Sequence, residues 1–417
     1  MILSPELITF LSMVSVFIVS AMVAKLPVSL SLMAASVVGG LVGVASFPVR
    51  HLVEGTFGYL DTILVIATAM IYMKSIQRSG LLSTIANQII KGFRRQPLAL
   101  LIVLTFFAMF PGMITGSSTV AVLTAGAIVA PVMMNLGIPR NKTGAIIALA
   151  GILGMIAPPV NIPAMIIGGG VDMPYIGFSL PLILTTFPLA ILFSLGLGYR
   201  HLGKVNLEEM DLPQSHYSDF GLTLYAPFII LIALLIIEQA FTRVVPSLGM
   251  PLIFLISAAT ALVFGKEVKI LETTKKAIDE ALPIMGILAG VGMFIQIMTL
   301  TGVRGFVVST LTGLPPSFLY LSIGISMPLF GAVSAYGSAS ILGVPFMLSL
   351  LGTDQILAAS ALSLVAGLGD LMPPTALAGL FAAQVVDQEN YFKIVKFCVL
   401  PGLLTVGYGI FLILSPW

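Results

Sequence analysis

Two short stretches of small and hydroxyl-bearing residues interrupt apolar sequence that is long enough to lie in a membrane. They are TGSST at residues 115–119 and YGSAS at residues 336–340. Glycine lets backbones approach closely, and serine or threonine hydroxyls together with freed backbone carbonyls offer the oxygen ligands that hard cations prefer. The same residue types also form close-packed surfaces between membrane helices, so helix packing is the alternative interpretation.

Each stretch is followed by a segment in which prolines break an apolar helix. APPVNIP occupies residues 157–163 and MPPT occupies residues 372–375. Proline removes a backbone donor and clashes with the preceding turn. A bilayer tolerates the freed polar groups only where protein buries them or where they line a wet cavity. Because Asn161 and Thr375 add polar side chains beside the breaks, the pattern favours the binding site of a transporter over simple helix kinks.

Asp370 is an ionisable residue within apolar sequence, whereas Met155 holds the matching position before the first proline pair. A carboxylate in a medium of low dielectric constant tends to be neutral unless a cation compensates its charge. Ionisable residues at membrane depth are therefore functional candidates by default. Three roles remain open for this carboxyl group: it binds a coupling cation, it carries a proton, or it forms a structural salt bridge or cap.

A membrane enzyme is the competing class of function. GLGD at residues 367–370 matches the Gly-x-Gly-Asp signature of intramembrane aspartyl proteases, in which two carboxyl groups share a proton to activate water. Asp61 is the only candidate for the second carboxyl group, and it lacks the tyrosine that precedes it in those enzymes. We expect no enzymatic activity and no catalytic residues, and keep the protease as a remote alternative. A channel is the third class.

The composition predicts an all-α polytopic membrane protein. Of the 417 residues, 58% are hydrophobic and 9% are charged, against about 25% charged in a soluble domain. The formal net charge of +2 is too small to indicate a nucleic-acid partner. Apolar runs of about 20 residues, each long enough to span a bilayer, recur along the chain. Lys74 lies near the end of one such run and is expected to extend toward the membrane surface.

The two halves of the chain repeat the same motifs in the same order. Gly116 and Gly337 stand 221 residues apart, and Gly154 and Gly369, which precede the two proline pairs, stand 215 apart. We therefore predict N-terminal helices over 1–55 and a first repeat over 56–199, with a re-entrant hairpin at 97–138 and a broken helix at 143–170. A polar linker at 200–219 and further helices over 220–265 follow. The second repeat covers 266–417, with a hairpin at 315–353 and a broken helix at 355–386.

Charge predicts the orientation, because cytoplasmic loops collect lysine and arginine. If the N-terminus faces outside and both hairpins return to the side they came from, sixteen of these residues lie toward the cytoplasm. Only Arg50, Arg243 and Arg304 then lie outside. The two hairpins enter from opposite sides in this arrangement. The repeats are therefore inverted, which is typical of carriers that alternate their access across the membrane.

Nearly the whole chain resembles the large membrane subunit of TRAP (tripartite ATP-independent periplasmic) transporters, within the wider ion-transporter superfamily. Several motifs carry the resemblance. KLPVS at 25–29 is similar to a Gly-x-Pro-Val turn of the family, and ITGS at 114–117, with its spacing to Pro131, is similar to a Ser-Gly-Ser hairpin tip. The broken helices at 154–159 and 372–378 and the Leu400-Pro401 pair also match the family pattern. Two positions depart from the family pattern: Ala121 replaces a frequent aspartate, and Asp370 is additional.

The resemblance implies an elevator mechanism, in which a transport domain moves against a scaffold that includes the helices over 1–55 and 220–265. It also implies Na⁺ as the coupling ion and no other cofactor. It implies a small organic acid as substrate, such as a C4-dicarboxylate or a sialic acid. It also implies a small four-helix membrane subunit and an extracytoplasmic substrate-binding protein as partners, in the cytoplasmic membrane of a bacterium or archaeon. A proton-coupled or partner-independent carrier of the same superfamily is the alternative.

The candidate site residues come from the two tips and the two broken helices. The predicted substrate-binding residues are Thr115, Gly116, Ser117, Ser118, Asn161, Tyr336, Gly337, Ser338 and Thr375. The predicted cation ligands, through side chains or backbone carbonyls, are Ser117, Thr119, Pro158, Ser338, Ser340, Asp370 and Pro373.

Overall fold

The computed structural model describes residues 4–202, 221–240, 248–264, 269–350, 352–373 and 375–415. Most of the predicted polar linker, together with Arg243 and Pro374, lies outside this range. The regular secondary structure of the described residues is entirely helical, and eight of its helices are long and apolar enough to cross a membrane. The predicted class, an all-α polytopic membrane protein, is confirmed.

The first half begins with four helices and a short connector helix, followed by the first interrupted segments. The elements are α1 (Pro5–Ile18) with the π-helix η1 (Val19–Val23), α2 (Val28–Val44), α3 (Val49–Thr56), α4 (Leu60–Arg78), α5 (Leu81–Phe93), α6 (Pro97–Thr115), α7 (Ser118–Ala121), the π-helix η2 (Val122–Gly126), α8 (Ala127–Asn135), α9 (Arg140–Ile156), α10 (Ile162–Gly170), α11 (Ser179–Gly198) and η3 (Tyr199–His201).

The second half adds a helix pair and then a similar series. Its elements are η5 (Gly221–Tyr225), α13 (Ala226–Ala240), α14 (Gly249–Phe264), α15 (Ile270–Leu300), α16 (Val303–Thr312), α17 (Pro316–Gly331), α18 (Ala335–Ser338), the π-helix η6 (Ala339–Gly343), α19 (Val344–Ser349), α20 (Gln355–Gly367), η7 (Leu368–Leu371), α21 (Leu377–Val385) and α22 (Phe392–Leu414).

The first hairpin breaks where the sequence predicts. Gly116 ends α6 with φ +63°, a backbone conformation that glycine adopts without steric cost. A Cβ at this position would overlap the side chain of Ile162, so the tip is also too crowded for a larger residue. The Ser117 hydroxyl then accepts a hydrogen bond from Val120 N (3.4 Å) and caps the start of α7. The chain therefore turns between Gly116 and Ser117.

The predicted position of the second break is wrong. Residues 336–340 lie inside α18 and η6, and the chain turns at residues 332–334 instead. Ser334 is the cap here, because its hydroxyl accepts a hydrogen bond from Gly337 N (3.1 Å) and satisfies one of the free donors of the first helical turn. Ser117 therefore corresponds to Ser334, and Gly337 is a helical residue rather than the counterpart of Gly116.

The corrected register is the same through the whole hairpin. Ser117 and Ser334 are 217 residues apart, and so are the prolines inside the preceding helices, Pro111 and Pro328. The π-helices at 122–126 and 339–343 also differ by 217 residues. Matching interruptions at a constant offset show that the two hairpins are built alike.

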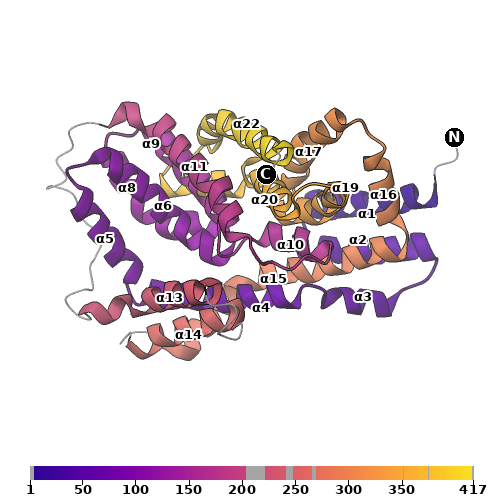
Figure 1. Ribbon diagram of the computed structural model, residues 1–417, viewed down its shortest axis with the longest axis horizontal. Helices are drawn as coiled ribbons and strands as arrows, with labels where there is room; N and C mark the ends of the chain where they lie inside the picture. Colours follow the sequence, from indigo (N-terminus) through magenta and orange to yellow (C-terminus); the bar gives the residue numbers. More distant parts are fainter. Residues whose placement is uncertain are drawn as a thin grey trace.

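The two hairpins occupy different ends of the molecule and meet at their tips. In Figure 1, α6 and α8 lie in the left part, whereas α17 and α19 lie in the right part. The Tyr336 hydroxyl donates a hydrogen bond to the Gly116 carbonyl oxygen (2.8 Å), which joins the second tip to the first. The backbones of Gly331 and Gly369 approach so closely that a Cβ on Gly369 would overlap Gly331. Close glycine contacts therefore hold the second hairpin against the second broken helix.

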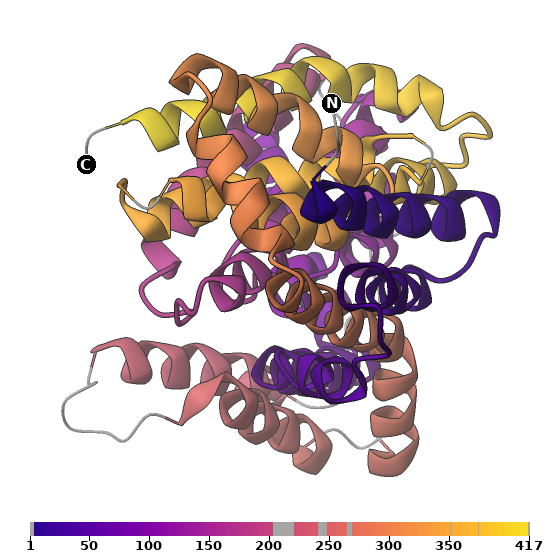
Figure 2. The same ribbon diagram turned by 90° about the vertical axis from the view of Figure 1, so that its right-hand side faces the viewer.

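A separate layer of helices covers one side of the hairpins. Helices α4 and α15 pack against each other, and α14 packs against α4. Figure 2 shows this layer from the end of the molecule, with the pink helices α13 and α14 at the bottom and the yellow α22 near the top. Residues of α4, of α15 and of both tips line the cavity that contains the candidate site.

The corrected second tip leads to a stability prediction. Replacing Ser334 by alanine removes the cap of α18, and we expect a loss of about 1 kcal/mol in the free energy of unfolding. Denaturant titration of the purified protein in detergent measures this loss. Ser309→Ala is the matched control, because the Ser309 hydroxyl is exposed and bonds only within its own helix. If the free energy of unfolding changes negligibly in both variants, the assignment of Ser334 as the cap is contradicted.

Candidate functional site

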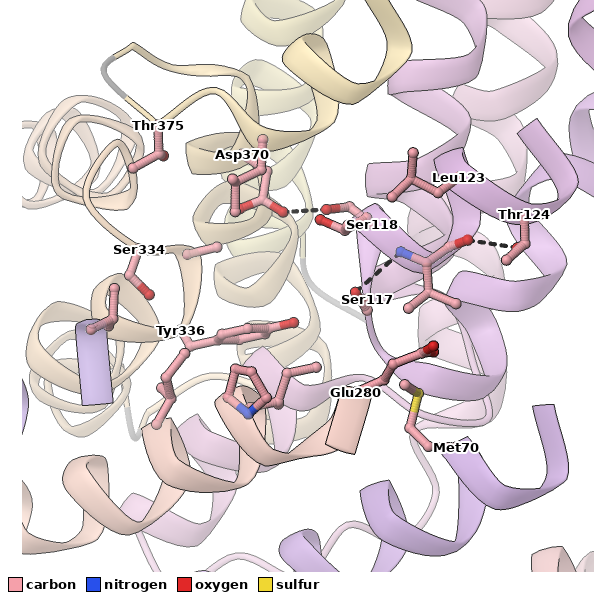
Figure 3. Close-up of a pocket in the computed structure, with 18 of the residues that line it drawn as sticks. Met70, Ser117, Ser118, Leu123, Thr124, Glu280, Ser334, Tyr336, Asp370 and Thr375 are labelled. Atoms are coloured by element: carbon pink, nitrogen blue, oxygen red, sulfur yellow. Dashed lines mark hydrogen bonds between the residues drawn. The ribbon is translucent and has the colours of Figure 1, made fainter. Parts of the chain in front are cut away.

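A cavity of about 640 Å³ lies where the two tips face the α4–α15 layer. This volume suits a small organic molecule. The polar and charged residues among those that line the cavity are Lys74, Gln77, Ser117, Ser118, Thr119, Thr124, Glu280, Ser334, Tyr336, Asp370 and Thr375. Figure 3 shows that the labelled members of this group come from both hairpins, from the second broken helix and from α15.

The centre of the site is a hydrogen bond between the first tip and η7. The Ser118 hydroxyl, at the first tip, donates a hydrogen bond to Oδ2 of Asp370 in η7 (Figure 3). Asp370 is 7% exposed, and Ser118 is 2% exposed. A buried carboxyl group is costly unless it is hydrogen-bonded and its charge is balanced. This arrangement therefore suits a group that exchanges a cation or a proton.

The cavity wall carries oxygen atoms of the kinds that bind small cations. The Asp370 carboxylate, the Ser117 and Ser118 hydroxyls and the Thr375 hydroxyl all line the same cavity, and oxygen ligands of these types are the ones that hard cations prefer. Within the described residues, no group of three or more His, Cys, Asp or Glu side chains could hold a metal ion. The candidate cation site thus has one carboxylate and several neutral oxygens.

Tyr336 and Thr375 position the second tip. The Tyr336 hydroxyl bonds the Gly116 carbonyl oxygen at 2.8 Å, and the Thr375 hydroxyl bonds the Ala332 carbonyl oxygen at 2.8 Å. The second contact satisfies a carbonyl group that the break after α17 would leave free. Both side chains line the cavity. A ligand in the cavity thus contacts residues whose positions depend on the closure of both tips.

Six of the predicted site residues line the cavity: Ser117, Ser118, Thr119, Tyr336, Asp370 and Thr375. Thr115, Ser338 and Ser340 do not line it, and their hydroxyls donate to the backbone carbonyls of Pro111, Met327 and Gly337 respectively. Gly116, Pro158, Gly337 and Pro373 also lie outside its lining.

Asn161 lies behind the first tip rather than in the cavity. Its Oδ1 accepts a hydrogen bond from Ala164 N (2.9 Å), so that it caps α10. Its Nδ2 donates to the Ile156 carbonyl oxygen (2.7 Å) and to the Ser363 hydroxyl (2.9 Å). Asn161 therefore bridges the break between α9 and α10 and ties it to α20.

Five polar or charged residues of the cavity were not predicted as members of the site: Lys74, Gln77, Thr124, Glu280 and Ser334. Ser334 is marked in the sequence by its distance of six residues from Pro328, which equals that of Ser117 from Pro111. The expectation that Lys74 extends to the membrane surface is wrong. Its side chain is 12% exposed, and Nζ forms a 2.6 Å ion pair with Oε1 of Glu280. Nothing local in the sequence indicates this pairing between distant helices.

Comparisons with known proteins place the chain in a family. The model of the family described as "Tripartite ATP-independent periplasmic transporter, DctM component" matches residues 14–416. The fold is similar to that of the YdaH transporter of Alcanivorax borkumensis, whose crystal structure is described as having an unusual topology. This similarity has a TM-score of 0.63 at 17% identity and covers 86% of this chain and 85% of the other. The curated proteins compared with the sequence contain no match.

Proposed function

Because this chain belongs to the DctM family of tripartite ATP-independent periplasmic transporters, we propose that it is the carrier subunit of a Na⁺-driven uptake system for a small organic acid. The Ser118–Asp370 hydrogen bond supports this proposal most directly, since it joins the first tip to η7 at the wall of a cavity that can hold a small organic molecule. A buried carboxyl group at such a junction suits a coupling ion whose binding closes the two tips together.

The proposed coupling scheme uses the residues at the two tips. Na⁺ binds between the Asp370 carboxylate and the hydroxyls of Ser117 and Ser118. It compensates the buried negative charge and lowers the cost of placing an anion nearby. The substrate lies beside Tyr336 and Ser334, whose positions depend on both tips. Loss of Na⁺ then leaves Asp370 uncompensated and favours release of the anion.

A proton-coupled carrier is the second candidate, and Asp370 is the observation that favours it. A buried carboxyl group can be neutralised by a proton as well as by Na⁺. Its hydrogen bond with Ser118 is compatible with either state, because a hydroxyl group both donates and accepts. Separate Na⁺ and pH gradients distinguish the two candidates.

We further propose inverted repeats and an elevator movement. The two similar hairpins lie at opposite ends of the molecule in Figure 1, which supports entry from opposite sides of the membrane. The cavity is lined by the part of α4 that precedes the basic connector helix α5. We therefore assign this conformation to the state that opens toward the cytoplasm.

The proposed partners are a small membrane subunit and an extracytoplasmic substrate-binding protein, with which members of this family normally work. The test is uptake into proteoliposomes of labelled succinate, N-acetylneuraminate and pyruvate, with and without these partners. The proposal expects accumulation of at least one acid that depends on an imposed ion gradient. Uptake that only equilibrates the acid, whatever gradient is imposed, would identify a channel or facilitator instead.

The orientation can be tested in intact cells. We expect α5 on the cytoplasmic side and α16 on the outer side, from the distribution of basic residues. A cysteine at Thr310 should react with a membrane-impermeant maleimide, whereas a cysteine at Gln88 should react only after permeabilisation. Both positions are exposed, and the native Cys398 is 2% exposed and is replaced by serine as a precaution. The reverse labelling pattern would invert the proposed topology.

A further inference from the structure

We propose that Lys74 is the carboxylate-binding subsite of the cavity and that Glu280 masks it in this conformation. The inference rests on the proposed function, because it assigns the group that recognises the acid. The Lys74 ammonium group is the only cationic side chain among the described residues that line the cavity. An organic anion that enters the cavity therefore has one direct partner of opposite charge.

The hydrogen bonds of Lys74 leave room for a ligand. Its Nζ contacts Oε1 of Glu280 at 2.6 Å and donates to Oε1 of Gln77 at 3.2 Å. A lysine ammonium group has three donors, so one N–H is not assigned to either contact. A substrate carboxylate can accept this third hydrogen bond or take the place of Glu280.

The two partners of the ion pair differ in their exposure to solvent. The side chain of Lys74 is 12% exposed, whereas that of Glu280 is 41% exposed. Releasing Glu280 to solvent therefore costs little, since a half-exposed carboxylate is already largely hydrated. Lys74 stays in the wall of the cavity and needs a negative partner there. The substrate carboxylate and Glu280 thus compete for one ammonium group.

The charges in the cavity explain why such a masked subsite is useful. Asp370 and Glu280 line the cavity together with Lys74. Without an anion bound, Glu280 neutralises Lys74, so the empty carrier can change conformation without an unpaired buried charge. With the acid bound, its carboxylate serves the same purpose. Because only an anion can take the place of Glu280 beside Lys74, the cavity favours organic anions over neutral molecules of similar size.

A neighbouring ion pair provides a matched control. Arg78 Nη2 contacts Glu272 Oε1 at 2.8 Å and joins the same two helices, α4 and α15. Neither Arg78 nor Glu272 lines the cavity. Substitutions in this second pair change the contact between the helices without changing the proposed subsite.

The experiment measures the Kd and the uptake of whichever acid of the succinate, N-acetylneuraminate and pyruvate panel the wild-type protein accumulates. Lys74→Met should raise the Kd about 10- to 100-fold, because this is the effect expected when one charge-assisted hydrogen bond is lost. Lys74→Arg should restore part of the affinity. Glu280→Gln should lower the Kd about two- to fivefold, because the competing charge is removed. Arg78→Met and Glu272→Gln should keep the wild-type Kd.

The direction of the Glu280→Gln effect separates the subsite from a structural role, since a damaged protein does not bind its substrate more tightly. If Lys74→Met and Glu280→Gln both keep the Kd of the wild-type protein, and the wild-type protein accumulates the acid normally, the subsite is overturned and the proposed function remains intact. A rise in Kd for both cavity variants would also overturn it. Failure of the wild-type protein to accumulate any organic acid would overturn both proposals.

Discussion

Asp370→Asn is expected to reduce gradient-driven uptake to the level of empty liposomes while the protein remains folded and inserted. Asparagine keeps the shape of the side chain and can still bond the Ser118 hydroxyl. It removes only the negative charge that a coupling cation would neutralise. Asp370 is 7% exposed, and a cation left there without its carboxylate partner would be buried and unpaired.

Uptake into proteoliposomes measures this effect, and elution of the detergent-solubilised variant as a single species checks its folding. Asp354→Asn is the matched control. Asp354 caps α20 by accepting a hydrogen bond from Leu357 N (2.9 Å), and asparagine caps helices about as well as aspartate. Normal gradient-driven accumulation by Asp370→Asn would reduce this residue to a structural role.

Gly116→Val is expected to abolish transport for a steric reason. Gly116 has φ +63°, which a β-branched residue adopts only with strain. A Cβ at this position would lie 2.6 Å from Cγ1 of Ile162. The first tip would then shift away from α10, and the Gly116 carbonyl oxygen would lose its alignment with the Tyr336 hydroxyl. We expect the substrate Kd to rise at least tenfold and uptake to be lost.

Gly196→Val in α11 is the control, because a Cβ there has no heavy atom within 4 Å apart from the helix backbone. It introduces the same residue into an apolar helix and should leave uptake close to that of the wild type. Both variants are measured by binding and uptake of the same labelled acid. Wild-type binding by Gly116→Val would show that the tip does not form part of the substrate site.

The interruptions of the first hairpin and of the helix after it could be predicted from the sequence because they depend on local chemistry. Gly116 can adopt the positive φ at which α6 ends, and the adjacent Pro158 and Pro159 together remove two backbone donors after α9. The same reasoning failed at the second tip, where GSAS after Tyr336 looks like GSST after Thr115. Ser334 caps α18 before that glycine is reached, so the resemblance between the two short motifs misplaced the break.

The composition of the cavity could be predicted only in part. Ser117, Ser118, Asp370 and Thr375 stand beside breaks that the sequence marks, and all of them line the cavity. Tyr336 also lines the cavity, although the break predicted at this residue lies at residues 332–334 instead. The Lys74–Glu280 ion pair joins residues that are 206 positions apart, in α4 and α15. Their meeting depends on how α4 packs against α15, and no local sequence pattern specifies that packing.

The central claim is that a cation gradient drives the uptake of an organic acid through the site at Asp370. Its most direct test is uptake by the wild-type protein in proteoliposomes under an inward Na⁺ gradient at equal pH, and under a pH gradient without Na⁺. We expect accumulation above equilibrium with the Na⁺ gradient and none with the pH gradient alone. Accumulation driven by the pH gradient alone would contradict Na⁺ coupling and identify Asp370 as a proton carrier. Equal uptake in the absence of both gradients would contradict coupled transport itself.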